Sequence, residues 1–166
     1  NTASRTVVVN PLPSIDISGD NIICAGTSTL LFASGATTYL WNTGATTTSI
    51  TVSPAATTTY SVTGTDGNGC ANTATEVVTV NANPTPIISG DQMICLGDTA
   101  TLNVTGGSTY LWSTGETTTS IEVVPNVTTA YSVTATDANG CIGVTSATVV
   151  VDPGTLTCST QNFTAY

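Results

Sequence analysis

The chain contains almost no basic side chains. Its 166 residues include a single Lys or Arg, which is Arg5, and no histidine, against ten Asp and Glu and a net charge of −9. A surface that binds nucleic acid needs Lys and Arg to neutralise phosphates, so the composition excludes that class of partner. The lack of histidine and lysine also removes the usual activated nucleophiles, and we predict that the protein is not an enzyme.

Long apolar runs and helical patterns are missing as well. No apolar run approaches the ~20 residues that a membrane-spanning helix needs, so we expect no membrane insertion. No segment has the character of a secretory signal peptide. Few charges combined with abundant threonine and valine are typical of a β-rich protein and not of a disordered one.

One segment of the chain occurs twice. Residues 39–50 read YLWNTGATTTSI and residues 110–121 read YLWSTGETTTSI, an offset of 71 (112 − 41) between the two tryptophans. Residues 10–80 align with residues 81–151 at this offset without a gap. The sequence therefore predicts a tandem-repeat protein, with one repeat at 10–80 and a second at 81–151.

The two ends of the chain lie outside these repeats. Residues 7–10 match residues 78–81, so we interpret residues 1–9 as the last strand of a preceding repeat. A window cut from a longer array explains this most simply; the alternative is a polymer in which residues 1–9 add a strand to a neighbouring subunit. Residues 152–166 leave the repeat and are interpreted as a tail or linker.

Each repeat has the pattern of six or seven short strands. Alternation in residues 100–104 predicts that Leu102 and Val104 point inward, and the same register in the first repeat turns Leu30 and Phe32 outward. A Pro-containing linker opens each repeat, and glycine-containing turns separate the strands. The fold class that follows is all-β, with one β-sandwich of about 71 residues per repeat. The other inward positions predicted in the first repeat are Leu31, Ala33, Tyr39, Trp41, Ile50, Val52, Tyr60 and Val62.

A tryptophan in one strand and a tyrosine opening a later one form an immunoglobulin-like arrangement. Residues 110–115 (YLWSTG) and 136–141 (TDANGC) resemble the Ig-like/PKD-like repeats of large secreted surface proteins of Bacteroidota-type bacteria, such as SprB-like gliding and adhesion proteins. The resemblance implies secretion by the type IX route and display outside the cell. It also implies a role in an adhesin, stalk or filament.

Four of the five cysteines recur as two pairs with a separation of 46, Cys24 with Cys70 and Cys95 with Cys141. Without histidine or a CxxC motif, disulfides are favoured over metal, which indicates an oxidising, extracytoplasmic setting. We predict the bonds Cys24–Cys70 and Cys95–Cys141, which require six strands per repeat. With seven strands the two cysteines lie at opposite ends, and Cys24 must reach Cys141 instead. Cys158 has no counterpart and is predicted to be unpaired or bonded externally.

Metal binding has one candidate pattern. Residues 66–69 and 137–140 resemble the first half of an Asp-rich calcium loop, but the remaining ligands are missing. We therefore interpret both as β-turns and predict no cofactor, with Ca²⁺ as the alternative. Calcium between repeats at Asp20 and Asp91 is a weaker hypothesis.

Three surface roles have candidate residues in this sequence: carbohydrate binding, ice binding and glycosylation. Trp41 and Trp112 have the chemistry of carbohydrate platforms. Each lies two residues after a tyrosine that is predicted to point inward, so both are favoured as core residues. The threonine runs suggest ice binding, which a twisted sandwich disfavours. Residues 98–100 are similar to an O-glycosylation site of Bacteroidota-type surface proteins. The candidate glycosylation residues are Thr99, Asn103, Asn126 and Asn162.

The sequence as a whole predicts structural modules of an extracellular surface adhesin, stalk or filament. Its expected partners are neighbouring repeats or other copies of the chain, with surface glycans as a further option. Two other functions stay open: a self-assembling filament subunit that donates residues 1–9, and a module that binds a glycan or a surface. For the latter, Leu30 and Phe32 mark the face on which the two repeats differ most.

Overall fold

The computed structural model describes residues 3–152 and divides the chain into two compact units, Asn1–Asn81 and Ala82–Tyr166. Within residues 3–152 every regular element is a β-strand. No helix in that range is long and apolar enough to cross a membrane. The predicted all-β class is confirmed.

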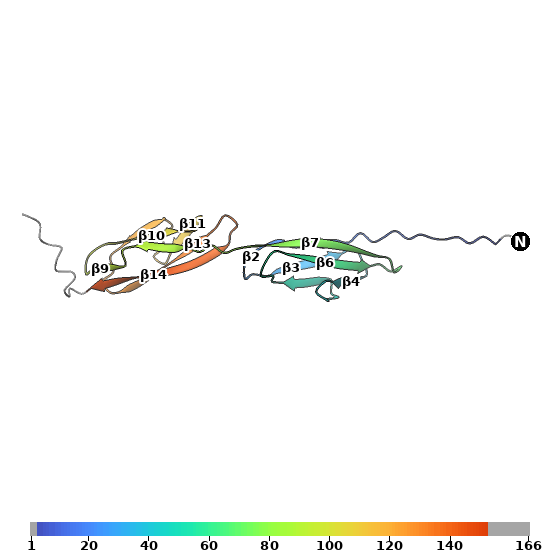
Figure 1. Cartoon of the computed structure of the whole chain (residues 1–166), viewed down its shortest axis with the longest axis horizontal. Helices are drawn as coiled ribbons and strands as arrows, with labels where there is room; N and C mark the ends of the chain where they lie inside the picture. The colour runs from blue at the N-terminus through green and yellow to red at the C-terminus, as the bar shows by residue number, and fades with distance from the viewer. Residues whose placement is uncertain (1–2, 153–166) are drawn as a thin grey trace, which may run out of the picture. The chain divides into compact units, whose positions relative to one another are not determined.

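Unit 1 is a sandwich of seven strands in two sheets (Figure 1). One sheet has the order β1-β3-β5 and the other the order β2-β7-β6-β4. All neighbours are antiparallel except β2, which runs parallel to β7 at one edge. The strands are β1 (Asp16–Ser18), β2 (Ile22–Cys24), β3 (Thr29–Ser34), β4 (Thr38–Trp41), β5 (Ser49–Val52), β6 (Thr58–Thr65) and β7 (Ala71–Asn81).

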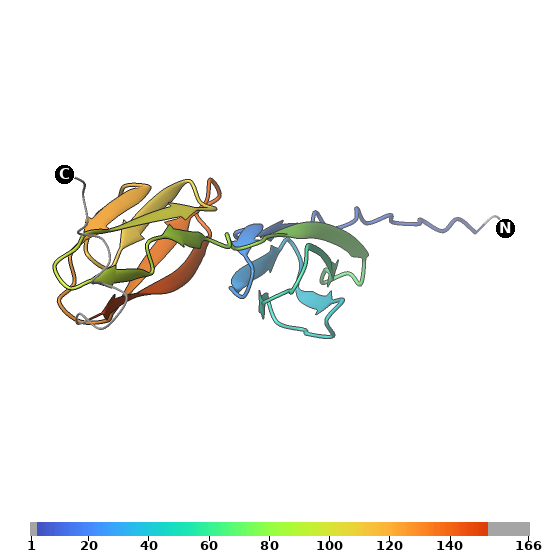
Figure 2. The same cartoon turned by 60° about the vertical axis from the view of Figure 1, so that its left-hand side comes forward.

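Unit 2 has the same order of seven strands (Figure 2, where it runs from yellow-green to red). Its sheets are β8-β10-β12 and β9-β14-β13-β11, and β9 again runs parallel to the longest strand, β14. Two packed sheets with this order form an immunoglobulin-like sandwich, as predicted. The strands are β8 (Ile87–Gly90), β9 (Met93–Cys95), β10 (Ala100–Thr105), β11 (Thr109–Trp112), β12 (Ser120–Val123), β13 (Thr129–Thr136) and β14 (Ile142–Asp152).

The core of each unit follows the alternation of its strands. In β3, Leu31 and Ala33 are buried while Leu30 and Phe32 are exposed, which confirms the predicted register. Successive side chains of a strand point to opposite faces, so one register fixes the whole strand. The other predicted inward residues of unit 1 are buried too, as are Leu102 and Val104 of unit 2.

The two tryptophans lie at the centres of these cores. Trp41 is 1 % exposed and Trp112 is 2 % exposed. Each indole Nε1 donates a hydrogen bond of 2.9 Å to a backbone carbonyl, that of Thr47 and that of Thr118 respectively. A carbohydrate platform needs an open ring face, so the core interpretation of both tryptophans is confirmed.

A close backbone approach makes one glycine of unit 2 hard to replace. Gly90 has φ +123°, and a Cβ there would overlap the carbonyl oxygen of Thr101. Gly97 also has positive φ, at +92°, but a Cβ there would meet nothing within 4 Å. Two penalties therefore act at Gly90, backbone strain and overlap with a neighbouring strand, whereas strain alone acts at Gly97.

We expect Gly90→Ala to lower the free energy of unfolding by about 3 kcal/mol, because strain and overpacking add. The matched control Gly97→Ala is expected to cost about 1 kcal/mol, since only the left-handed backbone is penalised. Urea denaturation followed by circular dichroism measures both. Equal losses for the two variants would contradict the backbone overlap at Gly90.

Candidate functional site: the cysteines at the two ends of each unit

Cys24 lies at the end of unit 1 from which the chain leaves. It is the last residue of β2 and is paired in register with Asn81, the last residue of β7. The backbone N–H of the next residue, Ala25, donates a 2.8 Å hydrogen bond to the carbonyl of Asn81. We call this the outgoing end of the unit.

Cys70 lies in the turn between β6 and β7. One carboxylate oxygen of Asp66, Oδ1, accepts hydrogen bonds from the backbone N–H of Asn68 (2.8 Å) and of Cys70 (2.9 Å). Gly69 supplies the left-handed residue of the turn, with φ +82°. The turn thus places Cys70 immediately before Ala71, the first residue of β7, and the interpretation of residues 66–69 as a β-turn is confirmed.

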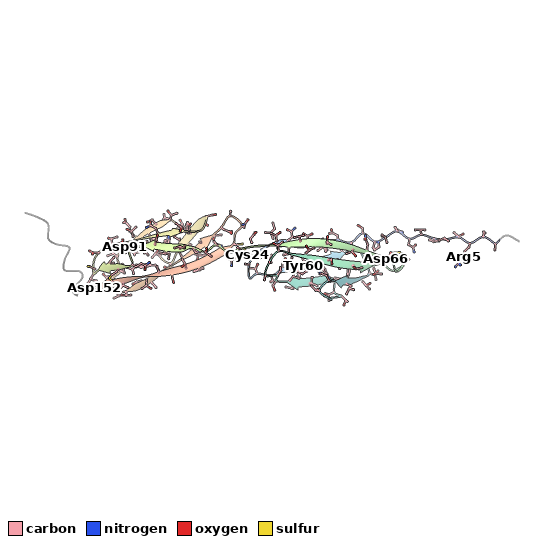
Figure 3. The ribbon with its side chains drawn as sticks, viewed as in Figure 1. Arg5, Cys24, Tyr60, Asp66, Asp91 and Asp152 are labelled. Carbon is pink, nitrogen blue, oxygen red and sulfur yellow. The ribbon has the colours of Figure 1, made fainter. Side chains whose placement is uncertain are left out.

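The two cysteines of unit 1 are therefore separated by the whole of β7. This strand has 11 residues, and at ~3.3 Å per residue its ends lie about 33 Å apart. Figure 3 labels Cys24 and Asp66, the residue that holds the Cys70 turn, at opposite ends of unit 1. The Cα atoms of a disulfide approach within ~7 Å, which this geometry forbids.

The predicted bond Cys24–Cys70 is consequently wrong. Cys70 is a free thiol, whereas Cys24 is disulfide-bonded. The unit has seven strands, not the six that this bond requires. The physical reason is the direction of β2, which runs parallel to β7: Cys24 ends β2 beside Asn81, whereas Cys70 precedes the first residue of β7.

Unit 2 repeats this arrangement. Cys95 ends β9 and pairs in register with Asp152, while Cys141 precedes Ile142, the first residue of β14. The Asp137 carboxylate holds the Cys141 turn through 2.9 Å and 2.8 Å hydrogen bonds from the N–H groups of Cys141 and Asn139. Both cysteines are disulfide-bonded, but β14 also has 11 residues, so the predicted bond Cys95–Cys141 is wrong for the same reason.

The chain enters each unit at the end opposite to the cysteine that ends its short parallel strand, which is Cys24 in unit 1 and Cys95 in unit 2. In unit 1 the side-chain amide of Asn72, the second residue of β7, donates a 3.0 Å hydrogen bond to the carbonyl of Pro13. In unit 2 a Cβ added at Gly143 would overlap the carbonyl oxygen of Pro84, so the incoming backbone lies against the start of β14. We call this the incoming end of the unit. Cys70 lies at the incoming end of unit 1, and Cys141 lies at that of unit 2.

The remaining candidate residues are not gathered into a site. The carbonyl of Asp20 accepts a hydrogen bond from the Thr29 hydroxyl (2.8 Å), and the Asp91 carboxylate accepts one from the N–H of Thr101 (3.1 Å). In the part of the chain that the structure describes, no group of three or more His, Cys, Asp or Glu is placed to hold a metal ion.

The glycosylation candidates of the described range lie at the surface. Thr99, Asn103 and Asn126 are all exposed, so each is accessible to a modifying enzyme and its modification stays a prediction. Asn162 and Cys158 lie outside the described residues.

No family model matches this chain, and no curated protein matches it in sequence. Solved structures do match the fold of this chain. Murine CEACAM1b is 12 % identical over 84 % of this chain and 100 % of its own, with a TM-score of 0.37. A 1.5-MDa bacterial ice-binding adhesin retained at a host cell surface is 20 % identical over 87 % of this chain and 66 % of its own, with a TM-score of 0.38.

A further adhesin, which is Ca²⁺-stabilised and comes from an Antarctic bacterium that binds ice, is 20 % identical with a TM-score of 0.42. The match covers 85 % of this chain, but the chain spans only 49 % of the length of that adhesin. Matches this distant assign no function to the chain.

Proposed function

We propose that the two units are structural modules of an extracellular surface protein, acting in an adhesin, stalk or filament. One observation supports this most directly: in each unit the chain joins at one end of the longest strand and leaves at the other. A module built in this way adds its own length to an array. Its partners are then neighbouring modules or other copies of the chain.

The chemistry of the units fits a passive role outside the cell. Cys24, Cys95 and Cys141 are disulfide-bonded, and disulfides persist in oxidising compartments. Both tryptophans and the tyrosines of the described residues are buried in the cores, and the chain has no histidine or lysine for catalysis. Secretion by the type IX route and a SprB-like identity belong to this proposal and rest on the sequence motifs alone.

A self-assembling filament subunit is the second candidate. Val7, Val8 and Val9 have no regular secondary structure and are strongly exposed, as a segment that donates a strand would be before it finds an acceptor. In both units, however, the place of the last strand is already filled, by β7 and by β14. An acceptor for residues 1–9 would therefore have to be a unit that lacks its own last strand.

A binding module is the third candidate. Leu30 and Phe32 are exposed on unit 1, whereas the equivalent positions of unit 2 carry Thr101 and Asn103. Exposed apolar side chains at these two positions of unit 1, where unit 2 has polar ones, are the feature that a glycan or a surface would recognise. Leu30→Ser with Phe32→Ser would weaken such binding and leave the core unchanged.

The structural role makes a prediction about length. A four-unit protein made by repeating residues 10–151 should be longer than the two-unit chain by about 65 Å, because each unit contributes about 33 Å along its longest strand. Negative-stain electron microscopy of both proteins measures this. Particles that grow in width and not in length would contradict the proposal, and uniform polymers of the two-unit chain would favour the filament subunit.

A further inference from the structure

We propose that Asn68 and Asn139 are modification sites, asparagines that convert to aspartate or isoaspartate, and that the turn around each one suppresses this reaction while its unit is folded. They are the two asparagines of the sequence that glycine follows. Glycine has no side chain to hinder its backbone nitrogen, so asparagine reacts more readily before glycine than before a larger residue. The proposal depends on the geometry inside each unit and stands even if the proposed function fails.

The reaction starts at the backbone nitrogen of Gly69. This nitrogen loses its proton to a base and attacks Cγ of the Asn68 side chain, which forms a five-membered succinimide ring. The bond from Cγ to the side-chain nitrogen breaks, and that nitrogen leaves as ammonia. Water then opens the ring at either carbonyl, which gives aspartate or isoaspartate and so adds one negative charge at neutral pH.

Both asparagines lie where water and base can reach them. Asn68 is exposed in the turn between β6 and β7, and Asn139 is exposed in the turn between β13 and β14. Figure 3 labels Asp66, the first residue of the turn of unit 1, at one end of that unit. Because solvent reaches both sites, any difference in rate between the folded and the unfolded chain must come from the conformation of the turn.

The turn holds Asn68 in a conformation that cannot form the ring. The N–H of Gly69 donates a 3.2 Å hydrogen bond to the carbonyl of Asp66, which makes residues 66–69 a β-turn. Gly67 has no positive φ, so the turn is of type I or II, and its third residue, Asn68, has ψ near 0° in both types. Ring closure needs the nitrogen of Gly69 in line with Cβ of Asn68, a rotation of about 120° about the tetrahedral Cα.

The carboxylate of Asp66 resists that rotation. Its Oδ1 accepts hydrogen bonds from the N–H of Asn68 (2.8 Å) and of Cys70 (2.9 Å), one on each side of the peptide that reacts. The N–H of Asp66 also donates a 2.9 Å hydrogen bond to the carbonyl of Cys70. Rotation about ψ of Asn68 moves Cys70 away from Asp66 and breaks these bonds, so the ring can form only after the turn has opened.

Unit 2 protects Asn139 in the same way. Oδ1 of Asp137 accepts hydrogen bonds from the N–H of Asn139 (2.8 Å) and of Cys141 (2.9 Å). The carbonyl of Asp137 accepts a 3.2 Å hydrogen bond from the N–H of Gly140. One chain therefore carries two copies of the same turn, and each copy serves as the reference for a change made in the other.

Peptide mapping by tandem mass spectrometry, after incubation at mildly alkaline pH, measures deamidation at each site. We expect both sites to react at least about tenfold more slowly in the folded protein than in the protein reduced and unfolded in guanidinium chloride, because hydrogen bonds to a charged group must break first. Detection of both aspartate and isoaspartate identifies the succinimide route. Equal rates in the folded and the unfolded protein would overturn the proposal.

Two variants test the role of the aspartates as positioning residues. Asp66→Ala is expected to raise the rate at Asn68 by about tenfold and to leave the rate at Asn139 unchanged, and Asp137→Ala should do the reverse. Circular dichroism establishes that each variant is folded. An unchanged rate at the altered turn, or an equal rise at both turns of a folded variant, would count against the proposal. If a variant does not fold, the comparison of the folded and the unfolded wild type decides.

Discussion

Replacement of Trp112 with alanine is expected to lower the free energy of unfolding by about 3–5 kcal/mol, the range for truncating a buried aromatic side chain. Trp112 is 2 % exposed and packs in the core of unit 2. The substitution opens a cavity between the two sheets and also removes the donor that satisfies the carbonyl of Thr118. A domain of this size has about 5–15 kcal/mol of stability, so most of unit 2 would unfold under mild denaturant.

The neighbouring residue supplies the control. Leu111 precedes Trp112 in β11 but points to the opposite face and is 54 % exposed. Leu111→Ala is expected to change stability by no more than about 0.5 kcal/mol, as surface substitutions usually do. Guanidinium denaturation followed by circular dichroism compares the two, and Trp41 fluorescence reports on unit 1 separately. A Trp112→Ala loss as small as that of Leu111→Ala would show that the indole does not support the core.

The core was predictable because it depends on local periodicity. Every second residue of a half-buried strand points inward, so Leu31 and Ala33 could be assigned once Leu102 and Val104 had fixed the register. The exposure of Leu30 and Phe32 followed from the same register, although their type alone would have placed them inside. Patterns of this kind carry over to the structure because they require no knowledge of the topology.

The cysteine pairing was not predictable in the same way, because it depends on which strand β2 pairs with and in which direction. Residues 22–24 are a segment of three residues, and nothing in three residues distinguishes an edge strand from a loop. In the structure β2 leaves the sheet of β1 and pairs with β7 in the other sheet. Because β2 runs parallel to β7, its last residue, Cys24, lies at the end of β7 that is opposite to Cys70.

One signal in the sequence did favour the observed arrangement. If residues 15–17 and 22–24 are both counted as strands, each repeat has seven strands and not the six that the predicted bonds require. The length of β7 and β14 was the second missing quantity, because a strand of 11 residues is unusual and sets the distance between those ends. The pairing in register of Cys24 with Asn81 becomes visible only in the fold.

The second prediction concerns the length of the chain under load. Consider a variant in which only Cys24 and Cys70 remain, with the other cysteines changed to serine. A bond within unit 1 would shield the 46 residue spacings between these positions (70 − 24) from the force, which is about 165 Å at ~3.6 Å per residue. We expect no change in contour length on reduction, because β7 holds the two cysteines about 33 Å apart. Single-molecule force spectroscopy with and without reductant measures the difference.

A variant with all five cysteines changed to serine is the matched control, because it unfolds the same two sandwiches and can form no disulfide. Its contour length should be the same with and without reductant, and equal to that of the Cys24/Cys70 variant. A gain of about 165 Å on reduction in the Cys24/Cys70 variant alone would show that the two cysteines bond. The expected absence of that gain follows from the parallel pairing of β2 with β7, which places Cys24 at the end of β7 that is opposite to Cys70. The direction of the strands, and not the separation of 46 residues in the sequence, decides which cysteines can meet.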